Sequence, residues 1–258
     1  MTSSSLTIQL RVIKALYIRE MISHFGRKNI GFLWMFIEPM MFSVGIAILW
    51  SLTLHSFGSI PPAGFALTGY SALVAWRNCV GRTSLAIQAN LGLIYHQNIT
   101  ILDLAITRAI FEFTATTISL IFLTIIFAAF GLIHFPVNPL EALLGWFLLG
   151  WFYVGAGLIA LFLNERSEIF HRVWHIVMYL TMPLTGAFSM VSWLPKNVQS
   201  LLLLSPMVNG VEILREGYFG ASIDAKYSIP YLLTINLITL LIGLLLVKRI
   251  KKFVEVEG

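Results

Sequence analysis

The chain has 258 residues, of which 58% are hydrophobic and 11% are charged, and its formal net charge is +5. A soluble domain typically carries about 25% charged residues, so the composition argues against a soluble globular protein, and the high hydrophobicity excludes intrinsic disorder. It predicts a polytopic membrane protein, in which the basic excess lies on the cytoplasmic side and does not bind nucleic acid.

Residues 6–28 are too interrupted by polar side chains to cross a bilayer, and they predict an amphipathic helix at the membrane interface. The apolar side chains in its second half recur at helical spacing, with Arg19 and Arg27 on the opposite face. The polar stripe changes sides near Tyr17. That change predicts a bend near Tyr17 or a helix wedged between lipid and a protein partner. An ordinary surface helix explains the pattern equally well.

Six further stretches have the length and apolarity of membrane-spanning helices, which need about 20 mostly apolar residues. All but Lys196, Arg215 and Lys226 of the 17 Lys and Arg residues then fall on one side. The positive-inside rule assigns that side, with both termini, to the cytoplasm. The predicted spans are residues 30–55, 64–81, 104–133, 140–163, 169–190 and 229–247.

Two connections between spans are long enough to have structure of their own. Residues 84–103 form a cytoplasmic loop, and residues 195–220 contain two short apolar helices separated by Pro206. We expect the second pair to form a re-entrant hairpin in the outer leaflet, because Leu201–Leu204 is apolar. The alternative is a pair of helices lying flat on the outer surface.

Three charged side chains, Glu38, Arg77 and Glu112, are predicted at similar depth inside the cytoplasmic leaflet. A charge there is costly unless it is paired or faces water. One interpretation is the polar lining of a translocation path, with Arg77 meeting an anionic substrate group. The other is ion pairing, for instance Arg77 with Glu38 and Arg108 with Glu112. We favour the ion pair for Arg108 and Glu112, and both interpretations stay open for Arg77.

Aromatic residues lie close to these charges. Tyr70 and Trp76 precede Arg77 in the second span and could stack on sugar rings, although packing or interfacial anchoring explains each residue more simply. Trp34 fits an interfacial position. The candidate pathway residues are Trp34, Glu38, Tyr70, Trp76, Arg77 and Glu112.

Several motifs are absent from the sequence. There is no phosphate-binding loop, so the chain is not expected to hydrolyse ATP or to act as an enzyme. His171 and His175 have no catalytic Glu between them and no third ligand, so we predict no metal site. We expect no cofactor on this chain. The glycine-rich stretch Gly150–Gly157 predicts close helix packing.

Three long strings of residues carry a resemblance to a known family. They run from Arg19 to Pro39, from Asn90 to Asp103 and from Pro206 to Gly220. Together they resemble the membrane permeases of capsular-polysaccharide ABC exporters, which are related to O-antigen and teichoic-acid export permeases. The resemblance extends through essentially the whole chain.

The resemblance implies an all-α subunit of the bacterial inner membrane with six spans, working as a homodimer with two separate ATP-binding subunits. Those subunits would hold the ATP and Mg. The substrate would be a lipid-linked acidic polysaccharide, passed on to periplasmic or outer-membrane export proteins. The outer end of the path would involve Pro206, Glu212, Arg215 and Tyr218.

The resemblance also implies that the cytoplasmic loop contains a coupling helix, at about residues 88–98, which inserts into the ATPase. The interfacial helix with Arg19 and Arg27 would lie beside the same ATPase. The implied coupling contacts are Leu91, Leu93, Ile94, Tyr95, His96 and Asn98.

Other functions remain open at this point. The same architecture could export O-antigen, teichoic acid or another lipid-linked polymer. A secondary transporter is expected to show internal repeats, and a membrane-embedded transferase is expected to cluster carboxylates or His residues on one face. The sequence shows neither pattern.

Overall fold

The structure is a computed structural model that describes residues 2–25, 41, 44–46, 48–49, 60–94 and 99–254. Within these residues the chain forms helices and turns and contains no strand, which confirms the all-helical prediction. The predicted first span, residues 30–55, lies almost wholly outside the described residues. In chain order the elements are α1 (Thr2–Phe25), α3 (Pro62–Ser84), η1 (Gln88–Asn90), α4 (Leu91–Ile94), α5 (Ile101–Ala129), α6 (Pro139–Arg166), α7 (Glu168–Leu180), η2 (Met182–Thr185), η3 (Val191–Trp193), α8 (Lys196–Leu202), α9 (Pro206–Phe219), η4 (Gly220–Ser222) and α10 (Ile229–Val254).

Helix α6 is the centre of the bundle, because it contacts α3, α5, α7, α9 and α10. Its glycines allow this close packing. A Cβ atom at Gly145 would lie 2.6 Å from the backbone nitrogen of Leu214 in α9, and one at Gly155 would lie 2.9 Å from that of Leu240 in α10. Small residues let helix backbones approach closely inside a membrane. The close packing predicted from Gly150–Gly157 is confirmed.

Three helices in the described part of the chain are long and apolar enough to cross a membrane: α5, α6 and the segment Ile229–Ile250 of α10. They correspond to the third, fourth and sixth predicted spans. Helix α5 ends at Ala129 and not at Ile133, because Gly131 adopts a left-handed φ of 69°. A residue with that φ cannot continue a right-handed helix.

Helix α3 coincides with the predicted second span, but it is an interior helix. Every residue from Ala63 to Trp76 is buried, and α3 packs against α5, α6 and α9. It also carries Arg77 and Arg82, and it is not among the three helices apolar enough to span on composition alone. Polar side chains of its buried stretch, such as Thr68 and Ser71, are enclosed by protein and do not face hydrocarbon. Hydropathy alone therefore does not identify α3 as an interior helix of the bundle.

The predicted fifth span, residues 169–190, is not one continuous helix. Helix α7 ends at Leu180, and its 13 residues extend about 20 Å at 1.5 Å per residue, short of the ~30 Å hydrocarbon core. Pro183 lacks a backbone N–H and disfavours helical conformation in the residue before it. Gly186 then adopts a φ of 75°. The continuous helix was a wrong prediction because these two residues outweigh the apolarity of the segment.

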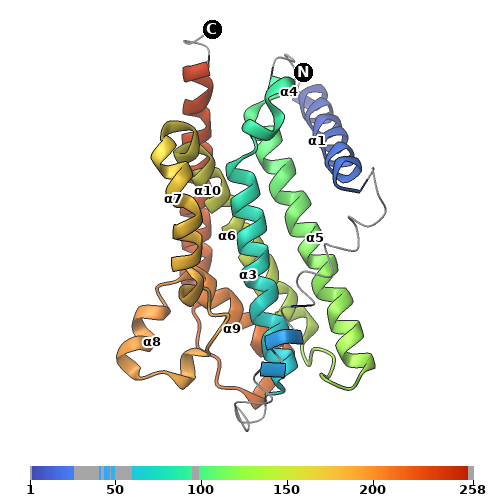
Figure 1. Cartoon of the computed structure of the whole chain (residues 1–258), viewed down its shortest axis with the longest axis vertical. Helices are drawn as coiled ribbons and strands as arrows, with labels where there is room; N and C mark the ends of the chain where they lie inside the picture. The colour runs from blue at the N-terminus through green and yellow to red at the C-terminus, as the bar shows by residue number, and fades with distance from the viewer. Residues whose placement is uncertain are drawn as a thin grey trace.

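Both ends of the chain lie at the same end of the bundle as α4, while α8 and α9 lie toward the opposite end (Figure 1). The predicted hairpin at residues 195–220 contains two helices, α8 and α9. Helix α9 is buried along most of its length and contacts α3, α6 and α10. The two loop regions singled out in the sequence therefore lie at opposite ends of the bundle.

Helix α1 runs without interruption through Tyr17 and packs along α5. Leu16 is buried, and the ring of Tyr17 meets Phe111 edge-on at a centroid distance of 5.6 Å. Gln9 Nε2 donates a hydrogen bond of 3.1 Å to Asp103 Oδ1. Contact with α5 along one face explains why polar side chains occur on more than one side of α1.

Candidate functional site

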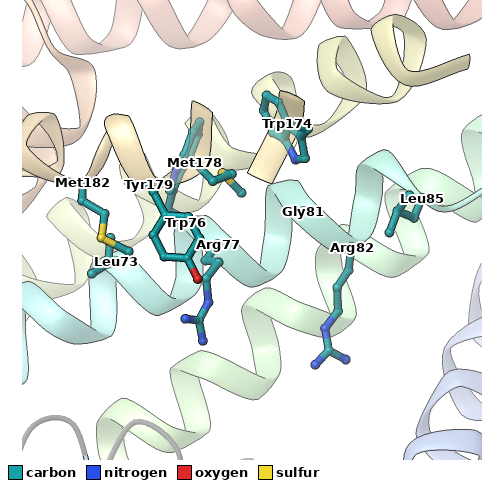
Figure 2. Close-up of a pocket in the computed structure, with 10 residues that line it drawn as sticks. All are labelled: Leu73, Trp76, Arg77, Gly81, Arg82, Leu85, Trp174, Met178, Tyr179 and Met182. Atoms are coloured by element: carbon teal, nitrogen blue, oxygen red, sulfur yellow. The ribbon is translucent and has the colours of Figure 1, made fainter. Parts of the chain in front are cut away.

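A cavity of about 270 Å³ lies between α3 and α7. Its walls combine aromatic and aliphatic side chains with two guanidinium groups, a mixture typical of ligand pockets. Figure 2 shows Arg77 and Arg82 extending to the same side of α3. We call this cavity the α3–α7 pocket. Its lining residues are Leu73, Trp76, Arg77, Gly81, Arg82, Leu85, Trp174, Met178, Tyr179 and Met182.

Tryptophan side chains supply much of the aromatic surface of the pocket. Trp76 stacks on Phe152 with ring centroids 5.8 Å apart and meets Tyr153 edge-on at 5.7 Å. The indole Nε1 atoms of Trp76 and Trp174 are buried and have no hydrogen-bond partner within the described part of the chain. A buried donor without a partner costs about 1–3 kcal/mol.

Arg82 links α3 to α5 through an ion pair with Glu112. Arg82 Nη1 lies 3.2 Å from Glu112 Oε1, and the two side chains are 41% and 5% exposed. The ion pair predicted between Arg108 and Glu112 is not formed, and Arg108 Nε has no hydrogen-bond partner among the described residues. Glu112 is buried where α5 packs against α3, so the arginine of α3 is the cation within its reach.

Replacing Arg82 by Gln is expected to lower the free energy of unfolding by about 1 kcal/mol, because Glu112 then stays buried without its cation. Because Arg82 is partly exposed to solvent, the expected loss of stability is smaller than for a fully buried ion pair. Thermal unfolding of the purified protein in detergent measures the change. A Glu112→Gln replacement in the same chain should restore most of the loss. Arg108→Gln is the matched control, and an equal loss there would contradict the assigned pair.

The structure brings some of the predicted pathway residues together. Trp76 and Arg77 line the α3–α7 pocket, and Glu112 is connected to it through Arg82. Tyr70 does not line the pocket. It lies in a buried cluster with Leu73, Val74 and Ala187, of which Leu73 also lines the pocket. The predicted grouping of charge and aromatic surface on α3 is thus observed for two neighbouring residues and not for Tyr70.

Other predicted site residues lie outside the described residues, and so does the predicted pairing of Arg77 with Glu38. Within the described part, no group of three or more His, Cys, Asp and Glu residues could hold a metal ion. The side chains of His171 and His175 are not described. The undescribed site residues are Arg27, Trp34, Glu38, Tyr95, His96, Asn98 and the side chain of Ile94.

Of the ten lining residues, only Trp76 and Arg77 were predicted from the sequence; the missed ones include the charged or aromatic residues Arg82, Trp174 and Tyr179. Arg82 was assigned to the cytoplasmic rim of basic residues. The α7 residues did carry a signal, because Trp174 and Met178 are four residues apart and therefore share one helix face. That face is the one that lines the pocket.

The short helix α4 presents an apolar surface at the end of the bundle that holds both termini (Figure 1). Leu91 is 58% exposed, and Leu93 is half-buried. The residue before α4, Asn90, is buried and donates to the carbonyl oxygen of Ala86 at 2.9 Å. Arg19 of α1 donates to Asn90 Oδ1 at 2.6 Å. Helix α1 is therefore tied directly to the α3–α5 connection.

The side chain of Arg215, one of the predicted outer-path residues, points into the protein and is fully buried. Its guanidinium group donates to the carbonyl oxygens of Gly186, Ala187 and Ser189 at 2.8, 3.1 and 3.2 Å. It also lies 3.8 Å from the centre of the Phe65 ring. Arg215 thus holds the turn after α7 against α3 and α9.

The remaining predicted residues of this end also lie in or beside α9. Pro206 occupies the first turn of the helix, where its missing N–H leaves no bond unmade. Glu212 accepts hydrogen bonds from the backbone nitrogens of Val191 and Lys226 at 3.2 and 3.0 Å. The hydroxyl group of Tyr218 is hydrogen-bonded to α5. The polar side chains of α9 therefore fix the loops around it.

Comparisons with known proteins match nearly the whole chain. The ABC-2 type transporter family matches residues 11–219. The chain is 38% identical to the capsule polysaccharide export inner-membrane protein CtrC of Neisseria meningitidis serogroup B, over 97% of this chain and 95% of that protein. It is 37% identical to BexB of Haemophilus influenzae over the same shares. It is 28% identical to the polysialic acid transport protein KpsM of Escherichia coli, over 95% of this chain and 96% of that protein.

Proposed function

The chain belongs to the ABC-2 type transporter family, and on that premise we propose that it is the transmembrane subunit of an ATP-driven exporter. Its substrate is a lipid-linked acidic capsular polysaccharide, which it moves from the cytoplasmic side across the bacterial inner membrane. The observation that carries this proposal is similarity over 97% of the chain to relatives named as capsule polysaccharide export inner-membrane proteins. Similarity over that length covers both ends of the bundle and the α3–α7 pocket.

The exporter contains two copies of this chain and two ATP-binding subunits, which hold the ATP and Mg. Periplasmic and outer-membrane export proteins receive the polymer. The lack of a phosphate-binding loop in the sequence supports a separate ATPase. ATP-driven closure of the ATPase pair presses on the two copies of α4 and separates the two permease copies, which opens the path between them.

The end of the bundle that holds α4 and both termini faces the cytoplasm. The basic residues near the C-terminus, including Lys248 and Arg249, support this orientation. The hairpin of α8 and α9 then lies on the outer side, with α9 re-entrant. Re-entrance is supported by the cover that α3, α6 and α10 give to α9, because irregular backbone at membrane depth needs protein around it.

The replacement Leu91→Asp is expected to reduce the amount of ATPase recovered with the detergent-solubilised permease about tenfold or more. Leu91 is an exposed apolar residue of α4, and an unpaired charge buried in an interface is strongly unfavourable. Leu91→Met is the matched control, since it keeps an apolar side chain of similar volume. Equal recovery with Leu91→Asp and Leu91→Met would rule out α4 as the docking surface.

The α3–α7 pocket meets the substrate as it enters the path. Arg77 and Arg82 bring guanidinium groups to a largely apolar cavity. Trp76 and Trp174 add aromatic surface, and their N–H groups have no hydrogen-bond partner among the described residues. Guanidinium groups bind carboxylates and phosphates with two parallel hydrogen bonds. This combination matches a ligand that carries acidic groups on a sugar chain with a lipid at one end.

Replacing Arg77 by Ala is expected to lower surface polysaccharide about tenfold or more while the protein stays inserted in the membrane. A charge-assisted hydrogen bond contributes about 1.5–3 kcal/mol, and 1.4 kcal/mol corresponds to a factor of ten in binding. Capsule staining and membrane immunoblots measure the two quantities. Arg77→Lys keeps the charge and should retain part of the export. Normal export by a stably inserted Arg77→Ala protein would remove Arg77 from the path.

Purification together with the candidate ATPase, followed by mass spectrometry of bound glycolipid, tests the proposed function as a whole. The expected result is a complex with two copies of each subunit and a bound lipid that carries acidic sugars. Failure of the chain to assemble with any ATPase would refute the exporter. Assembly with a bound lipid that carries only neutral sugars would refute the acidic substrate.

A further inference from the structure

A second cavity, of about 360 Å³, lies between α5, α6 and α9. It shares no lining residue with the α3–α7 pocket, and it lies toward the C-terminal end of α5. We call it the α5–α6–α9 pocket. Its lining residues are Thr117, Leu120, Ile121, Thr124, Ile125, Phe135, Pro136, Pro139, Ala142, Leu143, Trp146, Leu214 and Tyr218.

The polar side chains in the wall of this pocket are already bonded to one another. Trp146 Nε1 donates to Thr117 Oγ1 at 2.8 Å, and the hydroxyl groups of Thr124 and Tyr218 lie 2.7 Å apart. The two threonines also donate to backbone carbonyl oxygens of their own helix. A water molecule needs two to four polar partners, and a polar ligand needs free donors or acceptors. The chemistry of the wall therefore selects hydrocarbon.

The mouth of the pocket opens on the lipid side of two spanning helices. Ile121 and Ile125 of α5 and Leu143 of α6 line the pocket and are also exposed on the surface of the bundle. Both helices are apolar enough to cross a membrane, so these side chains meet the acyl chains of the bilayer. The pocket is thus continuous with the lipid-facing surface.

The size of the cavity distinguishes between two possible occupants, an acyl chain and a helix of another protein. An α-helix with its side chains is about 10–12 Å wide, so a cavity of about 360 Å³ does not admit one. A single flexible hydrocarbon chain can enter such a space from the bilayer. Filling it restores the dispersion contacts that an empty apolar cavity lacks.

We propose that the α5–α6–α9 pocket binds one acyl chain of a bilayer phospholipid. The acyl chain contacts Leu214 and Tyr218 and thereby stabilises α9 where this helix packs beside α5 and α6. This lipid site is distinct from the α3–α7 pocket and needs neither ATP nor the polysaccharide. Lipid binding at this site can therefore be measured independently of the proposed export function.

The test uses the full chain in lipid nanodiscs that contain phosphatidylethanolamine with a photoreactive diazirine in the middle of one acyl chain. After irradiation, peptide mapping locates the adducts. The expected result is labelling concentrated on residues 117–125 and 135–146. Ile125→Trp blocks the mouth and is expected to reduce this labelling about fivefold, because a close-packed indole leaves little room for the chain. Labelling spread evenly over the outer surface of α5 would overturn the site.

Ile118→Trp is the matched control, since Ile118 is exposed on the same helix and does not line the pocket. Its labelling should equal that of the unchanged chain, and an equal loss in both variants would overturn the proposal. A second measurement tests whether another copy of the protein covers the pocket. In a Cys79→Ala background, Ile125→Cys is expected to form no disulfide between the two copies of the chain under oxidation. An intersubunit disulfide at this position would assign the pocket to a protein contact and overturn the lipid.

Discussion

Replacing Arg215 by Met is expected to lower the free energy of unfolding by about 3–5 kcal/mol, the cost of breaking a buried charge network. The guanidinium group of Arg215 is the donor for three carbonyl oxygens of the turn after α7. It also lies 4.0 Å from a carboxylate oxygen of Glu212. Methionine fills similar space but leaves these acceptors buried without a donor. Loss of the turn would detach the segment that joins α7 to α9.

The measurement is the midpoint of thermal unfolding in detergent, together with the amount of protein inserted in membranes. Lys196→Met is the matched control, because Lys196 is exposed on the neighbouring α8 and its loss should change stability by less than about 0.5 kcal/mol. Arg215→Lys should fall between the two, since an ammonium group keeps the charge without the planar fork. A stable Arg215→Met protein would contradict the assigned role.

The parts of the fold that followed from the sequence depend on local properties. Long apolar stretches predicted α5, α6 and α10, and the small residues of Gly150–Gly157 predicted tight packing of α6. The end of α7 was missed because Pro183 is embedded in an apolar run. Composition measures whether a segment can lie in hydrocarbon, and backbone chemistry decides where its helix stops. The two criteria disagree in residues 181–190.

The sequence predicted the part of the candidate site whose residues are neighbours on a single helix. Trp76 and Arg77 are neighbours on α3, and the sequence placed them together beside a possible path. The partner of Glu112 depends on how α5 is rotated against α3, which helical spacing within α5 does not determine. Spacing favoured Arg108, and packing brought Arg82 within 3.2 Å. Contacts between helices are set by tertiary packing, which a single sequence does not display.

The polar residues of α9 also show that the sequence alone does not decide the role of a charged residue. The resemblance to export permeases implied that Arg215 contributes to the outer end of the path. In the structure its guanidinium group is buried against Phe65 and the turn after α7. A charged residue in a membrane protein is either exposed to water or paired inside. The sequence indicates that such a residue matters, and only the fold decides between these two roles.

Replacing Gly217 by Val is expected to destabilise the bundle by about 1–3 kcal/mol or more, because it separates α9 from α6. A Cβ atom at Gly217 would collide with the backbone nitrogen of Ala142 and lie 2.6 Å from its Cα atom. The carbonyl oxygen of Gly217 also accepts a hydrogen bond of 2.8 Å from the backbone nitrogen of Asn138. Neither backbone can move aside without breaking the start of α6.

Gly92→Ala is the matched control, because Gly92 is also helical and a Cβ atom there would meet nothing within 4 Å. Alanine should stabilise that position by about 0.5–1 kcal/mol through the lower entropy of the unfolded chain. Thermal unfolding midpoints of the two variants should therefore move in opposite directions. If Gly217→Val unfolds at the same temperature as the unchanged chain, the close contact of α6 and α9 is not the one that holds the hairpin in place.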